Sequence, residues 1–118
     1  MKLENNWQQK TIENLEKNIW PQSNQHSHLI NTCSLLRKKP IQNFTIEDLR
    51  IMIGQEIGLD YLIPFAIEKL SIDLFAEGDM YEGDLLKSVL NIDTDFWKSN
   101  KIYWQQINEL ISPRREEL

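Results

Sequence analysis

Apolar residues recur at helical spacing along most of the chain, and the alternation typical of strands is missing. The densest stretch, residues 45–90, reads TIEDLRIMIGQEIGLDYLIPFAIEKLSIDLFAEGDMYEGDLLKSVL. It begins with a helix start signal, because the Thr45 hydroxyl can cap free backbone N–H groups and the acids Glu47 and Asp48 suit the positive end of a helix dipole. We therefore predict a helix over residues 46–57, ended by Gly58 in the left-handed conformation.

A second helix is predicted to follow at once. Asp60 is placed to cap it, and residues 62–70 are apolar nearly all round, which indicates a central helix. Pro64 then falls at the edge of the first turn, where its missing N–H costs at most one backbone hydrogen bond. Beyond it the pattern breaks into LFAEGDMYEGD, a loop with two glycines and four acids, and Asp84 opens a third helix that runs to Leu90.

The N-terminal half predicts two more helices. Residues 3–20 carry a narrow apolar stripe typical of an amphipathic helix, which Pro21 ends, and Thr11 offers an alternative start inside it. The next helix is opened by Ser23 or Ser27 and runs to Lys39, with Leu29, Ile30, Cys33 and Leu36 turned inward. Its last turn is the basic run Arg37, Lys38 and Lys39, whose charge complements the helix dipole before a proline stops the helix.

The C-terminal part is predicted to be helical as well. Asp93 or Thr94 caps a short helical turn, and Asn100 starts a last helix that reaches Ile111. The tail RREEL has no apolar partner nearby in the sequence, so we expect it to be frayed.

These elements predict one compact all-α domain over residues 1–118, a bundle of about six helices. A chain of this length can bury roughly two thirds of its unfolded surface. The predicted core is made of apolar positions in the three central helices. They are Ile46, Leu49, Ile53, Leu62, Phe65, Ala66, Leu70, Leu85, Leu86 and Val89.

The order of several short segments resembles the immunity proteins of bacterial contact-dependent growth inhibition (CDI) systems. The segments are LRKKPI, then T-x-E-D-L-R, I-G-Q-x-I-G-L, AEGD and GDLL, and the resemblance covers about residues 29–111. It implies a small soluble protein without catalytic residues. Such a protein binds and neutralises the C-terminal toxin domain of a sibling cell's surface exoprotein.

Composition indicates where the protein is found. The single cysteine cannot form an internal disulfide, which suits a reducing cytoplasm. No apolar run approaches the ~20 residues of a membrane span, and the N-terminal MKLENNWQQK lacks the apolar core of a signal peptide. We expect a cytoplasmic protein that does not contact a membrane.

Charge is distributed unevenly along the chain. Residues 45–84 hold 2 bases and 10 acids, a net charge of −8, within a total of −5. Such a segment repels nucleic acid and attracts a basic partner. The acidic loop supplies the candidate toxin-binding residues, which are Glu77, Asp79, Tyr81, Glu82 and Asp84. Tyr81 either offers its ring for contact or anchors the loop from below.

Other functions have weaker support in the sequence. No motif for a nucleophile, a phosphate loop or a metal is present, so we expect neither enzymatic activity nor a cofactor. We predict a monomer that forms a 1:1 complex with a nuclease-type toxin by covering its basic cleft. Two alternatives stay open. The protein could be an acidic adaptor or nucleic-acid mimic unrelated to a toxin, or the contacts could come from residues 20–28 and 91–103.

Overall fold

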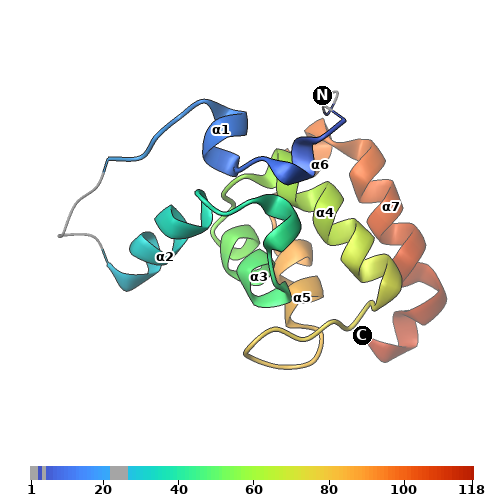
Figure 1. Cartoon of the computed structure of the whole chain (residues 1–118). Helices are drawn as coiled ribbons and strands as arrows, with labels where there is room; N and C mark the ends of the chain where they lie inside the picture. The colour runs from blue at the N-terminus through green and yellow to red at the C-terminus, as the bar shows by residue number, and fades with distance from the viewer. Residues whose placement is uncertain (1–2, 4, 22–26) are drawn as a thin grey trace.

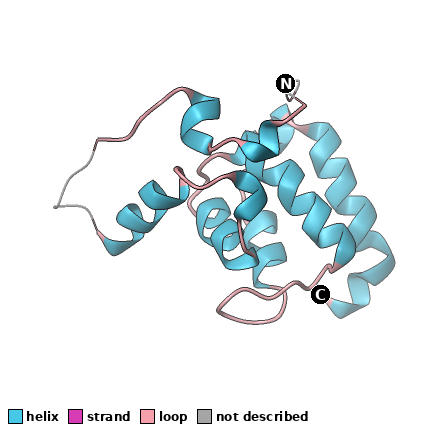
Figure 2. Cartoon of the chain, viewed as in Figure 1, coloured by secondary structure: helices cyan, strands magenta, loops and turns pink. Residues whose placement is uncertain are grey.

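The computed structural model describes residue 3 and residues 5–21 and 27–118, and in this part of the chain every regular element is helical (Figures 1 and 2). The α-helices, in chain order, are α1 (Ile12–Glu16), α2 (His28–Leu36), α3 (Ile46–Gly54), α4 (Leu59–Ile72), α5 (Asp84–Leu90), α6 (Thr94–Ser99) and α7 (Lys101–Ile111). The 3₁₀-helices are η1 (Trp7–Gln9), η2 (Ile41–Asn43) and η3 (Ser112–Glu117). The predicted all-α class is confirmed.

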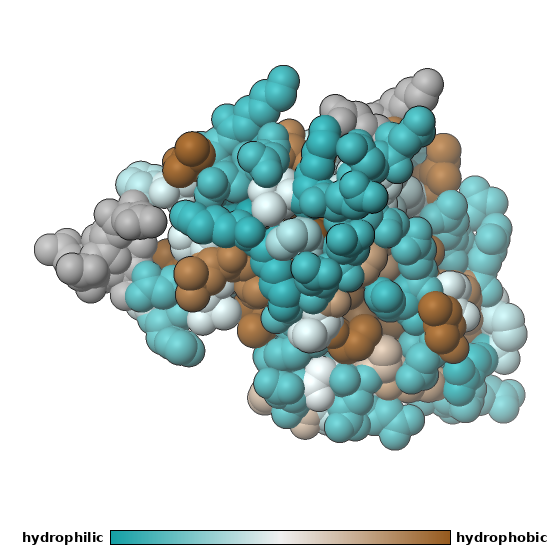
Figure 3. Space-filling view, viewed as in Figure 1, coloured by the Kyte–Doolittle hydropathy of each residue, from teal (hydrophilic) through white to brown (hydrophobic). Residues whose placement is uncertain are grey.

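The body of the domain is formed by α3, α4, α5 and α7. Helix α3 packs on both α4 and α5, and α7 packs on α4. Nine of the ten predicted core positions are buried, and the tenth, Ile46, is half-buried. The face drawn in Figure 3 is mostly hydrophilic, with apolar side chains scattered over it. In Figure 1 the connection from α4 to α5 forms a loop at the bottom of the body, close to the C-terminus.

Helix α3 begins as its sequence predicts. The Thr45 hydroxyl accepts from the Asp48 N–H at 3.1 Å, and the Asp48 carboxylate accepts from the Thr45 N–H at 3.0 Å, which completes a capping box. The predicted helix end at Ile57 is wrong, because α3 stops at Gly54. Gly58 has the expected left-handed conformation but precedes α4 instead, and it lies against Ile12, where a side chain would collide.

Helix α4 begins earlier than predicted. It starts at Leu59, so Asp60 lies inside its first turn and does not cap it. Pro64 is consequently the sixth helical residue and not part of the first turn. Its ring nitrogen cannot donate to the Asp60 carbonyl, and the helix continues with that one bond missing.

The predicted helix over residues 3–20 is wrong in its length, whereas the alternative start at Thr11 is confirmed. The chain turns extended at Lys10, and Thr11, whose hydroxyl accepts from the Asn14 N–H, starts the short helix α1. The Ile41 N–H donates to the Lys10 carbonyl at 3.0 Å, so this break is stabilised by a segment about 30 residues away. Local periodicity could not reveal that contact.

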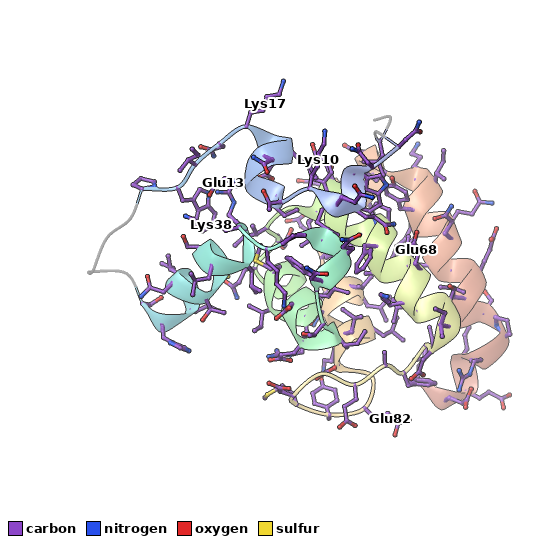
Figure 4. All side chains as sticks on the ribbon, viewed as in Figure 1. Lys10, Glu13, Lys17, Lys38, Glu68 and Glu82 are labelled. Carbon is purple, nitrogen blue, oxygen red and sulfur yellow. The ribbon has the colours of Figure 1, made fainter. Side chains whose placement is uncertain are left out.

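Arg37 attaches the N-terminal segment to the body. Its fully buried guanidinium donates from Nη2 to Glu16 Oε1 at 2.8 Å and to the Asn18 carbonyl at 2.9 Å, and it stacks over the Trp20 ring. The basic run was predicted to form the last turn of its helix and to terminate it, but α2 ends at Leu36 and Arg37 is a core residue. Of the positions expected to face inward, Cys33 and Leu36 are buried, whereas Leu29 and Ile30 are exposed. Lys38, next to Arg37, lies 3.6 Å from Glu13, and both are labelled in Figure 4.

The C-terminal helices follow the prediction more closely. Asp93 caps α6 by accepting from the Asp95 N–H at 2.8 Å, and α7 begins directly after Asn100. The prediction that the tail is frayed is wrong, however. The tail forms most of η3, and Arg114 stacks over the Phe75 ring at 4.6 Å.

Truncation of a core leucine in α4 should destabilise the fold. Leu70 is 1 % exposed, so Leu70→Ala removes buried methyl groups and leaves a cavity, at a cost of about 2 to 5 kcal/mol in the free energy of unfolding. Ile72 lies two residues further along the same helix and is 83 % exposed, so Ile72→Ala is the control and should change little. Urea unfolding of both variants measures the difference, and equal losses would contradict the assigned packing.

Candidate functional site

The acidic loop, residues 73–83, connects α4 to α5 and carries four of the five candidate residues. The first part of the loop packs on the body through apolar side chains. Leu74 and Ala76 are buried, and the Phe75 ring lies beneath Arg114. The Gly83 N–H donates to the Phe75 carbonyl at 3.1 Å and closes the loop at its base. The backbone is thus tied at both ends to the helical body.

The fifth candidate residue, Asp84, supports the loop from within. Its side chain is 2 % exposed, and its two oxygens accept from three backbone N–H groups of the loop. The donors are Gly78 at 2.7 Å, Met80 at 3.0 Å and Tyr81 at 3.3 Å. A carboxylate that accepts several amide hydrogen bonds holds a loop more firmly than neutral groups can. Asp84 therefore determines the course of the loop and presents no charge to a partner.

A second carboxylate, on α3, holds the tip of the loop. Glu47 Oε1 accepts from the Asp79 N–H at 2.9 Å and from Arg50 Nε at 2.6 Å. Arg50 also lies 3.8 Å from Asp84 Oδ2, so one guanidinium balances both acids. A Cβ at Gly78 would be 2.6 Å from Glu47 Oε1, so a side chain there would displace the carboxylate that holds the tip of the loop.

The two supporting acids are held in their ionised form. The hydrogen bond from Arg50 lowers the pKa of Glu47 below its ordinary value of 4.5, more than burial raises it. Burial raises the pKa of Asp84, but its three backbone donors and Arg50 outweigh burial and bring that pKa below 3.8.

The outer surface of the acidic loop consists of charges and two large side chains. Glu77, Asp79 and Glu82 are exposed, and none of them lies within ion-pair distance of a cation in the described residues. Beside them, Met80 is 66 % and Tyr81 is 48 % exposed. Figure 4 shows the labelled Glu82 directed away from the body. Within the described part of the chain none of the three carboxylates is neutralised by a direct ion pair, although Asp79 interacts electrostatically with Arg50 and Glu82 with Arg114.

Sequence reasoning missed three residues of this site. Glu47 and Arg50, three apart on a helix, were visible as an ion pair, but nothing local indicated that they reach a loop some 30 residues further on. Met80, the third, is more exposed than the neighbouring Tyr81.

The described residues give no support for a metal site or for a reactive cysteine. They contain no group of three or more metal-ligating side chains. Cys33, the one cysteine, is buried, and burial raises the pKa of its thiol. None of the described helices has the length and apolar character needed to cross a membrane. The second candidate segment, residues 20–28, lies partly outside the described residues.

The fold and the site define a class of protein, a small all-α domain that displays an acidic loop held by two carboxylates of the helical body. The family model of CDI immunity proteins matches residues 14–107. The match spans most of the 118 residues, and the chain belongs to the CDI immunity protein family. No curated protein and no solved structure matches it.

Replacing the buried loop acid should destabilise the protein. In Asp84→Asn one oxygen becomes an NH₂ group that faces backbone donors, so we expect a loss of about 1 to 3 kcal/mol. Asp79→Asn is the matched control, because the Asp79 side chain is exposed and only its backbone N–H is bound to Glu47. Thermal melts should separate the two variants, and equal midpoints would refute the supporting role of Asp84.

The lowered pKa values predict an acid limit to stability. Glu47 and Asp84 bind protons more weakly in the folded than in the unfolded chain, so they stabilise the fold above the unfolded pKa values and lose that contribution as pH falls. The thermal midpoint should therefore drop below about pH 4. In Asp84→Asn the drop should be smaller, and a profile that parallels the wild type would contradict the prediction.

Proposed function

We propose that this protein neutralises the C-terminal toxin domain of a cognate CDI exoprotein by binding it through the acidic loop. The toxin is of nuclease type, and the loop covers its basic cleft. Binding takes place in the cytoplasm between one toxin domain and one monomer of this protein. The protein has no catalytic activity of its own.

The observation that carries this proposal is the set of three unpaired carboxylates, Glu77, Asp79 and Glu82, on a loop whose backbone is already ordered. A cleft that binds a nucleic acid is lined with cations, and such a cleft attracts a concentrated negative charge from a distance. The prior order of the loop reduces the entropy that binding must remove. Family membership supplies the class of partner.

The aromatic and thioether side chains beside these acids support lasting contact. Exposed ion pairs in water contribute little and are screened by salt, whereas Tyr81 and Met80 can bury apolar area against a partner. Tyrosine is among the residues that dominate interface energies. We therefore assign encounter to the acids and much of the lifetime of the complex to the neighbouring side chains.

Charge reversal on the loop should weaken toxin binding without unfolding the protein. Asp79→Lys with Glu82→Lys should slow association about tenfold or more, and the effect should shrink in high salt. The thermal midpoint should hardly change, since exposed loop acids contribute little to stability. Binding kinetics with the purified toxin domain of the neighbouring gene, over a salt series, give the measurement.

The matched control reverses two exposed acids of the same segment that lie away from the loop. Glu56 follows the far end of α3, and Asp60 lies in the first turn of α4. The pair Glu56→Lys and Asp60→Lys changes the net charge equally and should retain most of the association rate. Failure of the wild type to form a one-to-one complex at micromolar concentration would refute the proposed function. It would then favour the acidic adaptor.

A further inference from the structure

A hollow lies between the end of α5 and the helices α6 and α7. Its volume is about 550 Å³. Seven side chains line it, namely Leu90, Ile92, Thr94, Trp97, Lys98, Lys101 and Trp104. The two indole rings are in contact, with centroids 5.1 Å apart, and Trp104 remains 38 % exposed while Trp97 is buried. We call this hollow the tryptophan groove.

The tryptophan groove adjoins the acidic loop. A second hollow of about 360 Å³ is lined by residues of the loop and of α5, among them Tyr81, Glu82, Lys87 and Leu90. Leu90, which is 37 % exposed, lines both hollows. In Figure 1, α5 leads from the loop toward α6, so the two hollows follow one helix. A partner seated on the loop is therefore beside the groove as well.

The rim of the tryptophan groove has the opposite charge to the loop. Lys98 and Lys101 stand at it, and in the described residues no carboxylate lies within ion-pair distance of Lys101. Lys98 has a single acid, Asp95, at 3.9 Å, and both of these side chains are more than three quarters exposed. Such a pair is weak in water, so the ammonium groups of Lys98 and Lys101 can each form an ion pair with a carboxylate of a partner.

We infer that the tryptophan groove binds an acidic segment of the same toxin domain, through an apolar side chain that stands beside an aspartate or glutamate. The apolar side chain packs against Trp104 and Leu90, and the carboxylate pairs with Lys98 and Lys101. This inference rests on the proposed function, because it takes the toxin domain as the partner. It adds a second contact of opposite charge and the residues that form it.

Charge and shape together select this occupant. A basic segment that fits the acidic loop is repelled by Lys98 and Lys101, so the two ends of α5 require different chemistry from the partner. Opposite charges at the two ends also determine the orientation in which a toxin domain docks, and like charges in the reversed orientation oppose it. A partly exposed tryptophan in such a hollow is the kind of residue that dominates an interface.

The test measures toxin binding by two groove variants. Trp104→Ala should raise the Kd at least tenfold, mainly through faster dissociation, because the lost contact forms after encounter. Lys98→Glu with Lys101→Glu should also raise the Kd about tenfold, and it alters exposed charges without disturbing packed rings. The second variant keeps the inference testable if the first one fails to fold.

The controls change the same chemistry elsewhere. Ile72→Ala removes an exposed apolar side chain from α4, and Lys17→Glu with Lys38→Glu reverses two exposed cations near α1 and α2. Both should bind the toxin with nearly the wild-type Kd. A carbodiimide, which joins an amine directly to a carboxylate, should link Lys98 or Lys101 to an aspartate or glutamate of the toxin in the wild-type complex.

The outcomes distinguish this inference from the proposed function. If the loop reversal weakens binding while both groove variants bind like the wild type, the groove inference is wrong and the proposed function stands. If the wild type does not bind the toxin domain, both fail. If Trp104→Ala instead dissociates an oligomer of the free protein, the groove holds a second copy of the chain and the inference is overturned.

Discussion

The candidate site depends on one buried carboxylate. Asp84 gathers three amide groups of the acidic loop onto the first residue of α5, where they and Arg50 compensate the cost of burying its charge. Glu47 holds the tip of the loop to α3 in the same way. The shape of a surface loop is thereby controlled by two acids that belong to the helical body, and α3, α5 and the loop form one unit.

Six of the ten acids in residues 45–84 fall into two groups with different roles. Glu47, Asp48 and Asp84 bind backbone N–H groups, and each lies near the charge of Arg50 or Lys39. In the described residues, the side chains of Glu77, Asp79 and Glu82 form neither a hydrogen bond nor an ion pair. A net charge of −8 therefore overstates the field that a partner meets, and the position of each acid decides its effect. The acids that shape the loop and those that face solvent can be changed independently.

Helix α5 joins two surfaces of contrasting character. Its first residue organises the acidic loop, and its last residue, Leu90, borders the tryptophan groove with its two lysines. In the proposed complex, negative charge at one end of α5 and positive charge at the other would select the orientation of the toxin domain as well as attract it. Because hydrogen bonds already hold the loop backbone, the loop would lose little conformational entropy in that complex.

The sequence by itself determined the features that depend on neighbouring residues. Helical periodicity predicted the all-α class and nearly all of the central core, and the caps at Thr45 and Asp93 act within three residues. Tertiary structure decided the rest. The break before Thr11 needs Ile41, the burial of Arg37 needs Glu16, and the role of Asp84 needs a loop held from α3. A sequence shows that an acid is present, but whether it faces a partner or its own backbone depends on contacts between distant segments.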